Sequence, residues 1–118
     1  MDKLQALHNF WSSFGWTAYN AKTVPDNAEL PYITHELPSS DFGNVIAQTA
    51  TLWNRSTAWT DVIDKYREIA TDISRGGKYV HYVGGAMHIR LNTAQDIDDP
   101  EDESVRGYVI NYEVEFLD

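Results

Sequence analysis

The segment from Arg106 to Leu117 alternates between apolar and polar side chains, and this pattern constrains the fold more than any other part of the sequence. Its apolar positions are Tyr108, Ile110, Tyr112, Val114 and Phe116, and its polar positions are Asn111, Glu113 and Glu115. Such alternation is typical of a β-strand that has one face on a core and the other in water. The sequence therefore predicts a sheet with a second layer packed on one side.

Two further segments have the composition of strands. Residues Val45 to Arg55 are rich in β-branched side chains, and neither of their two faces is clearly polar, so we expect both faces to be covered. A shorter strand is expected from Tyr32 to Leu37, because Pro31 and Pro38 flank it and limit its length.

A hairpin is predicted in residues 78–91, with Gly84 and Gly85 as its two-residue turn. This register places His81 opposite His88. The expected core face carries Val80, Tyr82, Met87, Ile89 and Leu91. The opposite face, which we expect to be solvated or to form an interface, carries Tyr79, His81, His88 and Arg90.

Apolar residues at three- and four-residue spacing predict two amphipathic helices, one from about Leu4 to Phe14 and one from Trp59 to Ile73. Residues 16–30 are expected to be irregular. With 118 residues the chain is long enough for one domain, residues 1–118, and too short for two sizeable cores. The predicted fold is an α+β domain: a mostly antiparallel sheet of about five strands, with both helices on one face.

Negative charge is concentrated near the end of the sequence. Residues 1–90 hold 9 acids and 8 bases, a net charge of −1, whereas residues 91–118 hold 9 acids and one base, a net charge of −8. An acidic, solvated loop is expected at about residues 92–104. Its acidic residues are Asp96, Asp98, Asp99, Glu101, Asp102 and Glu103. Tight binding to nucleic acid is not expected, because it requires clustered Lys and Arg.

No motif indicates catalysis. The chain has no cysteine, which excludes a disulfide framework, a Cys-ligated zinc site and a thiol nucleophile. It also contains no nucleophile elbow, phosphate-binding loop or zinc-protease motif. We therefore expect no enzymatic activity, no cofactor and no metal. The absence of a long apolar stretch and of a signal-peptide layout predicts a soluble intracellular product that does not interact with a membrane.

Two sets of residues are candidates for a protein interface. Trp53 and Arg55 lie at the end of a predicted strand, and Trp and Arg are enriched where protein surfaces bury each other. For Trp53 the alternative is packing beneath the start of the second helix. The second set consists of Tyr79, His81, His88 and Arg90 on the polar face of the predicted hairpin.

The layout of the whole chain resembles a known family. An N-terminal helix, the segment PYITHEL, a strand ending in LWNRSTAW, a Gly-Gly hairpin, an acidic loop and the segment RGYVINYEVEFLD together resemble the tail terminator (tail completion) proteins of long-tailed bacteriophages. Those of phages that infect Gram-positive bacteria are the most similar. The resemblance covers about residues 4–117 and carries over no catalytic residues.

The resemblance implies a structural protein of the virion. Such proteins form a homohexameric ring at the head–tail junction, contact the major tail-tube protein and the head-completion or connector protein, and end tube polymerisation. DNA passes through the ring without specific binding, and the acidic loop at 92–104 is expected to line this channel, where it repels phosphate. The protein would be made in the cytoplasm of the bacterial host.

Two other functions remain open from the sequence. One is an acidic binding or inhibitor protein, such as a DNA mimic or an immunity protein, although residues 1–90 are nearly neutral. The least favoured is a small hydrolase or metal enzyme that uses His35, His81 and His88, because two solvated histidines on a sheet are the simpler interpretation.

Overall fold

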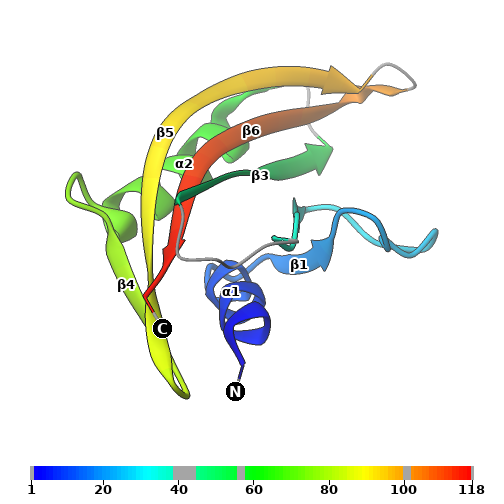
Figure 1. Cartoon of the computed structure of the whole chain (residues 1–118). Coiled ribbons are helices and arrows are strands. Elements are labelled where there is room, and N and C mark those ends of the chain that lie inside the picture. Colours follow the sequence, from blue (N-terminus) through cyan, green and yellow to red (C-terminus); the bar gives the residue numbers. More distant parts are fainter. Residues whose placement is uncertain (1, 39–44, 56–57, 100–101, 118) are drawn as a thin grey trace.

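The computed structural model describes residues 2–38, 45–55, 58–99 and 102–117 (Figure 1). Two helices and six strands follow one another along this part of the chain. Their bounds are α1 Lys3–Ser12, β1 Thr17–Asn20, β2 Tyr32–His35, β3 Val45–Arg55, α2 Thr60–Ile73, β4 Lys78–Tyr82, β5 Gly85–Asp99 and β6 Asp102–Phe116. Neither helix is long and apolar enough to cross a membrane.

The strands form one sheet in the order β1-β2-β3-β6-β5-β4. All neighbours are antiparallel except β1 and β2, which are parallel. The α+β class is confirmed, with one strand more than expected and one parallel pair. The prediction that residues 16–30 are irregular holds for residues 21–30 but was wrong at Thr17–Asn20, an edge strand whose four residues are too short to show a period.

The predicted acidic loop at residues 92–104 was also wrong. Most of this segment belongs to the long antiparallel pair of β5 and β6, in which Asp98 pairs with Arg106 and Asp99 with Asp102. β-Branched residues within and beside the acidic run, namely Thr93, Ile97 and Val105, fit a pleated strand. Figure 1 shows the outer end of this pair extending away from both helices.

The β4–β5 hairpin has a register shifted by two residues from the prediction. Val80 pairs with Met87, and His81 pairs with Ala86 rather than with His88. The turn residues are Val83 and Gly84, and Gly84 takes the positive φ of +96° that a residue with a Cβ rarely adopts. Because the shift is an even number, every side chain keeps its predicted face, and Met87 is buried as expected.

Both helices pack on the same face of the sheet, as predicted. The Trp11 indole of α1 donates a hydrogen bond of 3.4 Å to the Tyr112 hydroxyl of β6. In α2 the Tyr66 ring contacts the Tyr108 ring, with centroids 5.1 Å apart. We name this side the helix-covered face. Its residues on the central strand β6 are Tyr108, Ile110, Tyr112, Val114 and Phe116, of which all but Tyr108 are buried.

α1 is capped by Asp2, whose Oδ1 accepts the Gln5 backbone N–H at 2.8 Å. The Gln5 side chain donates from Nε2 to Asn9 Oδ1 at 2.9 Å. From the sequence, Ser56 or Thr57 is expected to cap α2, and both lie outside the described residues. The prediction that both faces of Val45–Arg55 are covered was wrong, because Val45 is 53% exposed on the side opposite the helices.

Candidate functional site

The six residues predicted to form an interface lie on one side of the sheet, the side that carries no helix in the described part of the chain. We name this side the helix-free face. It consists of the odd-numbered residues of β3 and β6 and their cross-strand neighbours on β2, β4 and β5. Cross-strand pairing places Tyr79, His88, Glu115 and Val45 in one row at one end of this face, and Trp53 pairs with Gly107 near the other end.

The end near β4 is polar and charged. The His88 ring contacts the Tyr79 ring, with centroids 4.7 Å apart, and its Nε2 donates to the Gly76 carbonyl oxygen at 2.9 Å. Arg90 forms an ion pair with Glu113, in which Nη2 and Oε2 are 2.5 Å apart. His81 is exposed and lies opposite Ala86. This end of the face therefore carries one ion pair together with polar and aromatic side chains.

The other end of the helix-free face is aromatic. The Trp53 indole N–H donates to Thr34 Oγ1 at 3.1 Å, and the ring lies over Gly107. A Cβ on Gly107 would come within 2.8 Å of both the Trp53 ring and Ile97. The alternative that Trp53 packs beneath the second helix was wrong, because Trp53 lies on the opposite face. Gly107 was missed, although a glycine inside an alternating strand signals the close approach of another group.

Beside Trp53 the face is hollowed into a pocket of about 240 Å³. We name it the Trp53 pocket. Its apolar wall consists of Ala28, Leu30, Tyr32, Trp53 and Val105, and its polar rim consists of Arg55, Asp99 and Asp102. The wall is extended on the same face by Tyr19, whose ring contacts the Tyr32 ring edge-on with centroids 5.5 Å apart. An aromatic pocket with a charged rim can accept an apolar group from another surface.

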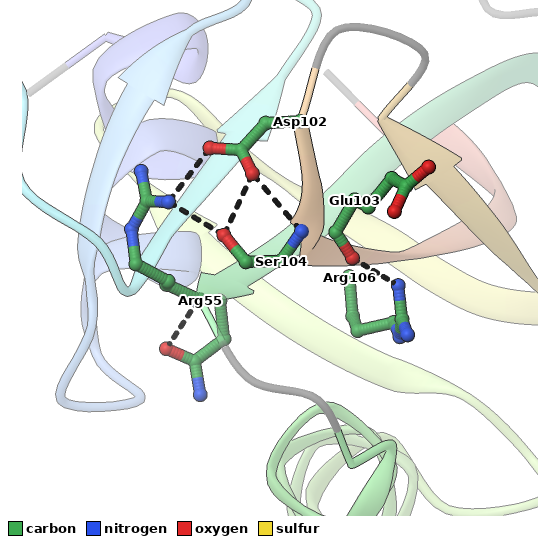
Figure 2. Close-up of polar contacts among 6 residues, drawn as sticks. Arg55, Asp102, Glu103, Ser104 and Arg106 are labelled. Atoms are coloured by element: carbon green, nitrogen blue, oxygen red, sulfur yellow. Dashed lines mark hydrogen bonds and ion pairs between the residues drawn. The ribbon is translucent and has the colours of Figure 1, made fainter.

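Arg55 joins this pocket to the acidic outer end of β5 and β6 (Figure 2). Its Nη1 lies 2.6 Å from Asp102 Oδ2 and 2.6 Å from Ser104 Oγ. Asp102 Oδ1 accepts hydrogen bonds from the Ser104 hydroxyl at 2.7 Å and from the Ser104 N–H at 2.9 Å. The Ser104 hydroxyl first, and then Arg55 and the Ser104 N–H, lower the pKa of Asp102 to about 2.

The other predicted channel residues are spread over the same outer end. Asp96, Asp98 and Glu103 are exposed, whereas Asp99 is half-buried, and Glu101 lies outside the described residues. Arg106 partly offsets this charge, because its guanidinium lies 3.5 Å from Asp98 and donates to the Glu103 carbonyl at 2.7 Å. The acids thus form a partly neutralised β-ribbon rather than a loop.

The three histidines of the metal-enzyme alternative do not come together. His35 is fully buried on the helix-covered face, whereas His81 and His88 lie on the helix-free face. His35 instead pairs with His8 of α1, with Nε2 and Nδ1 2.9 Å apart, a contact that the sequence analysis missed. Burial first, and then the proximity of His8, lower the pKa of His35 to about 4. Within the described ranges, no three His, Asp or Glu residues are grouped closely enough to hold a metal ion.

A chain among the solved structures shares this fold. That chain belongs to a virion. A chain in a structure described as the virion of a native gene transfer agent particle matches with a TM-score of 0.59. The match covers 92% of this chain and 84% of that chain, at 12% sequence identity, so it shows a shared fold. The sequence matches no protein-family model and no curated protein.

Proposed function

We propose that this protein is a structural component of a phage virion that forms a ring on the end of the tail tube. In this position it ends tube polymerisation and provides the surface that joins the head. The observation that carries the proposal is the fold shared with a virion chain over 92% of the present chain. The sequence resemblance to tail terminator proteins provides the specific role.

The described surface is compatible with assembly on several sides. The helix-free face carries the charged row around His88 at one end and the Trp53 pocket at the other. A ring component needs contacts with its own copies, with the tube protein and with the head-completion or connector protein. We propose that a homohexamer meets these needs and is located at the head–tail junction of the virion.

The exposed acids of the outer ribbon fit a channel through which DNA passes. Asp96 and Asp98 belong to the residues 96–103, which hold six acids and no base. Carboxylates repel the phosphates of DNA, so a duplex moves past such a surface without binding to it. We propose that this ribbon faces the channel.

We also propose that the protein acts without catalysis and without a metal. Purified protein is expected to contain no stoichiometric zinc by elemental analysis, and a His81→Ala/His88→Ala variant is expected to be unchanged in this respect. Stoichiometric zinc that is lost in the double variant would contradict this part of the proposal.

The acidic-inhibitor alternative receives less support from the geometry. A DNA mimic presents carboxylates over a broad face, but here they gather on one ribbon. Two of them are already close to arginines: Asp102 lies beside Arg55, and Asp98 beside Arg106. The charge available to a basic groove is therefore smaller than the composition indicates.

Deletion of the gene from a phage that encodes this chain tests the proposal. We expect tails of irregular length that do not join heads, and we expect restoration of normal tails when the gene is supplied in trans. Electron microscopy of lysates measures tail length and head attachment. Tails of normal length attached to heads in the deletion phage would overturn the proposed role.

A further inference from the structure

We infer that the turn of the β4–β5 hairpin of one copy of this chain inserts into the Trp53 pocket of the next copy. The repeated contact would join copies head to tail, and its closure into a ring rests on the proposed function. The contact is indicated by an apolar turn, a preformed pocket, the distance between them and the charge of the pocket end.

The hairpin turn presents an apolar side chain to solvent. Val83 is 81% exposed, more than any other large apolar residue in the described part of the chain. Leu117 is 47% exposed and lies beside the turn, because its N–H donates to the Ala86 carbonyl at 2.7 Å. Two-residue turns favour Gly, Asn and Asp, so neither the turn nor the core of the monomer requires a valine here. Burial of Val83 by another molecule explains its presence.

The Trp53 pocket suits an aliphatic side chain. Its volume of about 240 Å³ has room for a valine and part of its turn, and Leu30, Tyr32 and Val105 supply apolar contacts. The pocket is held in shape before any partner arrives. Thr34 accepts the Trp53 indole N–H, and Gly107 allows the ring to lie flat against the strand. A rigid pocket lowers the entropic cost of association.

The turn and the pocket lie at opposite ends of the molecule. β5 begins at Gly85, directly after the turn, and ends at Asp99, on the rim of the pocket. Figure 1 shows the hairpin turn at the bottom of the view and the outer end of β5 at the upper right, in a molecule whose longest extent is 43 Å. A chain therefore cannot fill its own pocket. Each copy offers one turn and one pocket, which is a heterologous contact that can close into a ring.

Charge also disfavours contact between two pocket ends. The pocket rim carries Asp99 and Asp102, and residues 96–103 hold six acids and no base. The turn residues Val83 and Gly84 are uncharged, and Lys78 at the base of the hairpin is paired with Asp72 at 2.7 Å. Like charges therefore keep two pocket ends apart, whereas the uncharged turn meets no such repulsion.

Because the chain has no cysteine, cross-linking tests the contact directly. We expect a Val83→Cys variant mixed with an Ala28→Cys variant to form a disulfide-linked dimer under mild oxidation, resolved on a non-reducing gel. The double variant is expected to give a ladder of oligomers. The matched control is Val45→Cys, because Val45 is also an exposed valine but lies at the far end of the helix-free face. It should not cross-link to Ala28→Cys. Absence of the first product at high protein concentration, or equal yield with the control, would overturn the inference.

A complementation experiment provides a second test. Val83→Asp removes the apolar turn residue, and Ala28→Arg fills the pocket, so each variant alone should associate at least about tenfold more weakly than the parent protein. Mixed together, the two variants should form a one-to-one dimer through their remaining intact ends. Sedimentation velocity measures this, and circular dichroism confirms that both variants fold. A Val83→Asp variant that associates like the parent, or a mixture that stays monomeric, would contradict the inference.

Tail assembly separates this inference from the proposed function. If the deletion phage makes irregular tails but the cross-link fails, the proposed function stands and the inferred contact is rejected. If the cross-link forms but the deletion phage makes normal tails, the contact stands and the proposed function is rejected.

Discussion

The two faces of the sheet differ although they are built from the same strands. On β6, Ile110, Tyr112 and Val114 are at most 1% exposed beneath the helices, whereas Asn111 and Glu113 between them are only half-buried on the helix-free face. The helix-covered face is closed by apolar packing. The helix-free face instead carries hydrogen bonds, ion pairs and the Trp53 pocket. Stability is therefore concentrated on one face, which leaves the other free to vary for recognition.

The largest expected effect comes from placing a charge on the helix-covered face. Met87→Asp puts a carboxylate at a fully buried position, and we expect the free energy of unfolding to fall by about 3–5 kcal/mol. The matched control is the adjacent His88→Asn on the helix-free face, which should cost about 1 kcal/mol or less. Urea denaturation measures both. Equal losses for the two variants would show that the faces are assigned wrongly.

The second-largest expected effect is a pH dependence of the free energy of unfolding, caused by the buried histidine on the helix-covered face. The pKa of His35 is about 4 in the folded protein and 6.5 in the reference state, so the unfolded chain binds the proton more tightly. The contribution of neutral His35 to the free energy of unfolding is fully present above about pH 6.5. The free energy of unfolding falls by about 3 kcal/mol as the pH drops to about 4.

A His35→Gln variant isolates this contribution from that of the carboxylates. Its absolute stability will differ from that of the parent, but its free energy of unfolding should depend less on pH between 6.5 and 4. Urea titrations at several pH values measure the slope. A parent and a variant with the same slope would show that His35 is protonated as readily in the folded chain as in the unfolded one.

On the helix-free face, the largest effect is expected at Gly107. An alanine there places its Cβ against Trp53 and Ile97, and overpacking of this kind costs about 1–3 kcal/mol. The NMR signal of the Trp53 indole N–H should also shift, because the ring has to move relative to Thr34. Adding Ile97→Ala should recover part of the loss, since it removes one of the two contacts. An unchanged melting temperature and indole signal would indicate that the ring does not lie on Gly107.

The smallest effect is expected at the ion pair of Arg55. Asp102→Asn should lower the urea midpoint slightly at pH 7, since exposed ion pairs contribute little. The pKa of Asp102 is about 2 in the folded chain against 3.8 in the reference state, so its contribution is present above about pH 4 and is lost as the pH falls toward 2. The charge-matched control is Asp96→Asn. The urea midpoints of all three proteins at pH 7 and pH 3 measure the difference, which should shrink at pH 3. A difference that grows at pH 3 would contradict the assignment.

The helix-covered face could be predicted well from the sequence, because a buried face requires apolar residues at a regular spacing. The alternation of β6, the bounds Val45–Arg55 of β3 and the apolar stripe of α2 are confirmed. The hairpin register was wrong since one glycine, Gly84, is sufficient for the turn. Edge strand β1 was missed because it has only four residues.

The helix-free face was harder to predict because its features depend on neighbours across strands. The sequence placed Trp53, Arg55, Tyr79, His81, His88 and Arg90 among the interface candidates, and the structure puts them on one face. Their role in binding stays a prediction. Neither the support of Trp53 by Gly107 nor the exposure of Val83 follows from local pattern, since each requires the register of the sheet.

The position of β6 in the sheet has a consequence for synthesis of the protein on the ribosome. β6 lies between β3 and β5, and it supplies Tyr112, the hydroxyl that the Trp11 indole contacts across 101 positions of the chain. Until residues 102–116 have left the exit tunnel, β3 and β5 have no strand between them, and the Trp11 indole of α1 lacks its hydrogen-bond partner. The nascent chain therefore holds two open strand edges until β6 emerges and pairs with both. Closure of the core is expected to wait for this step.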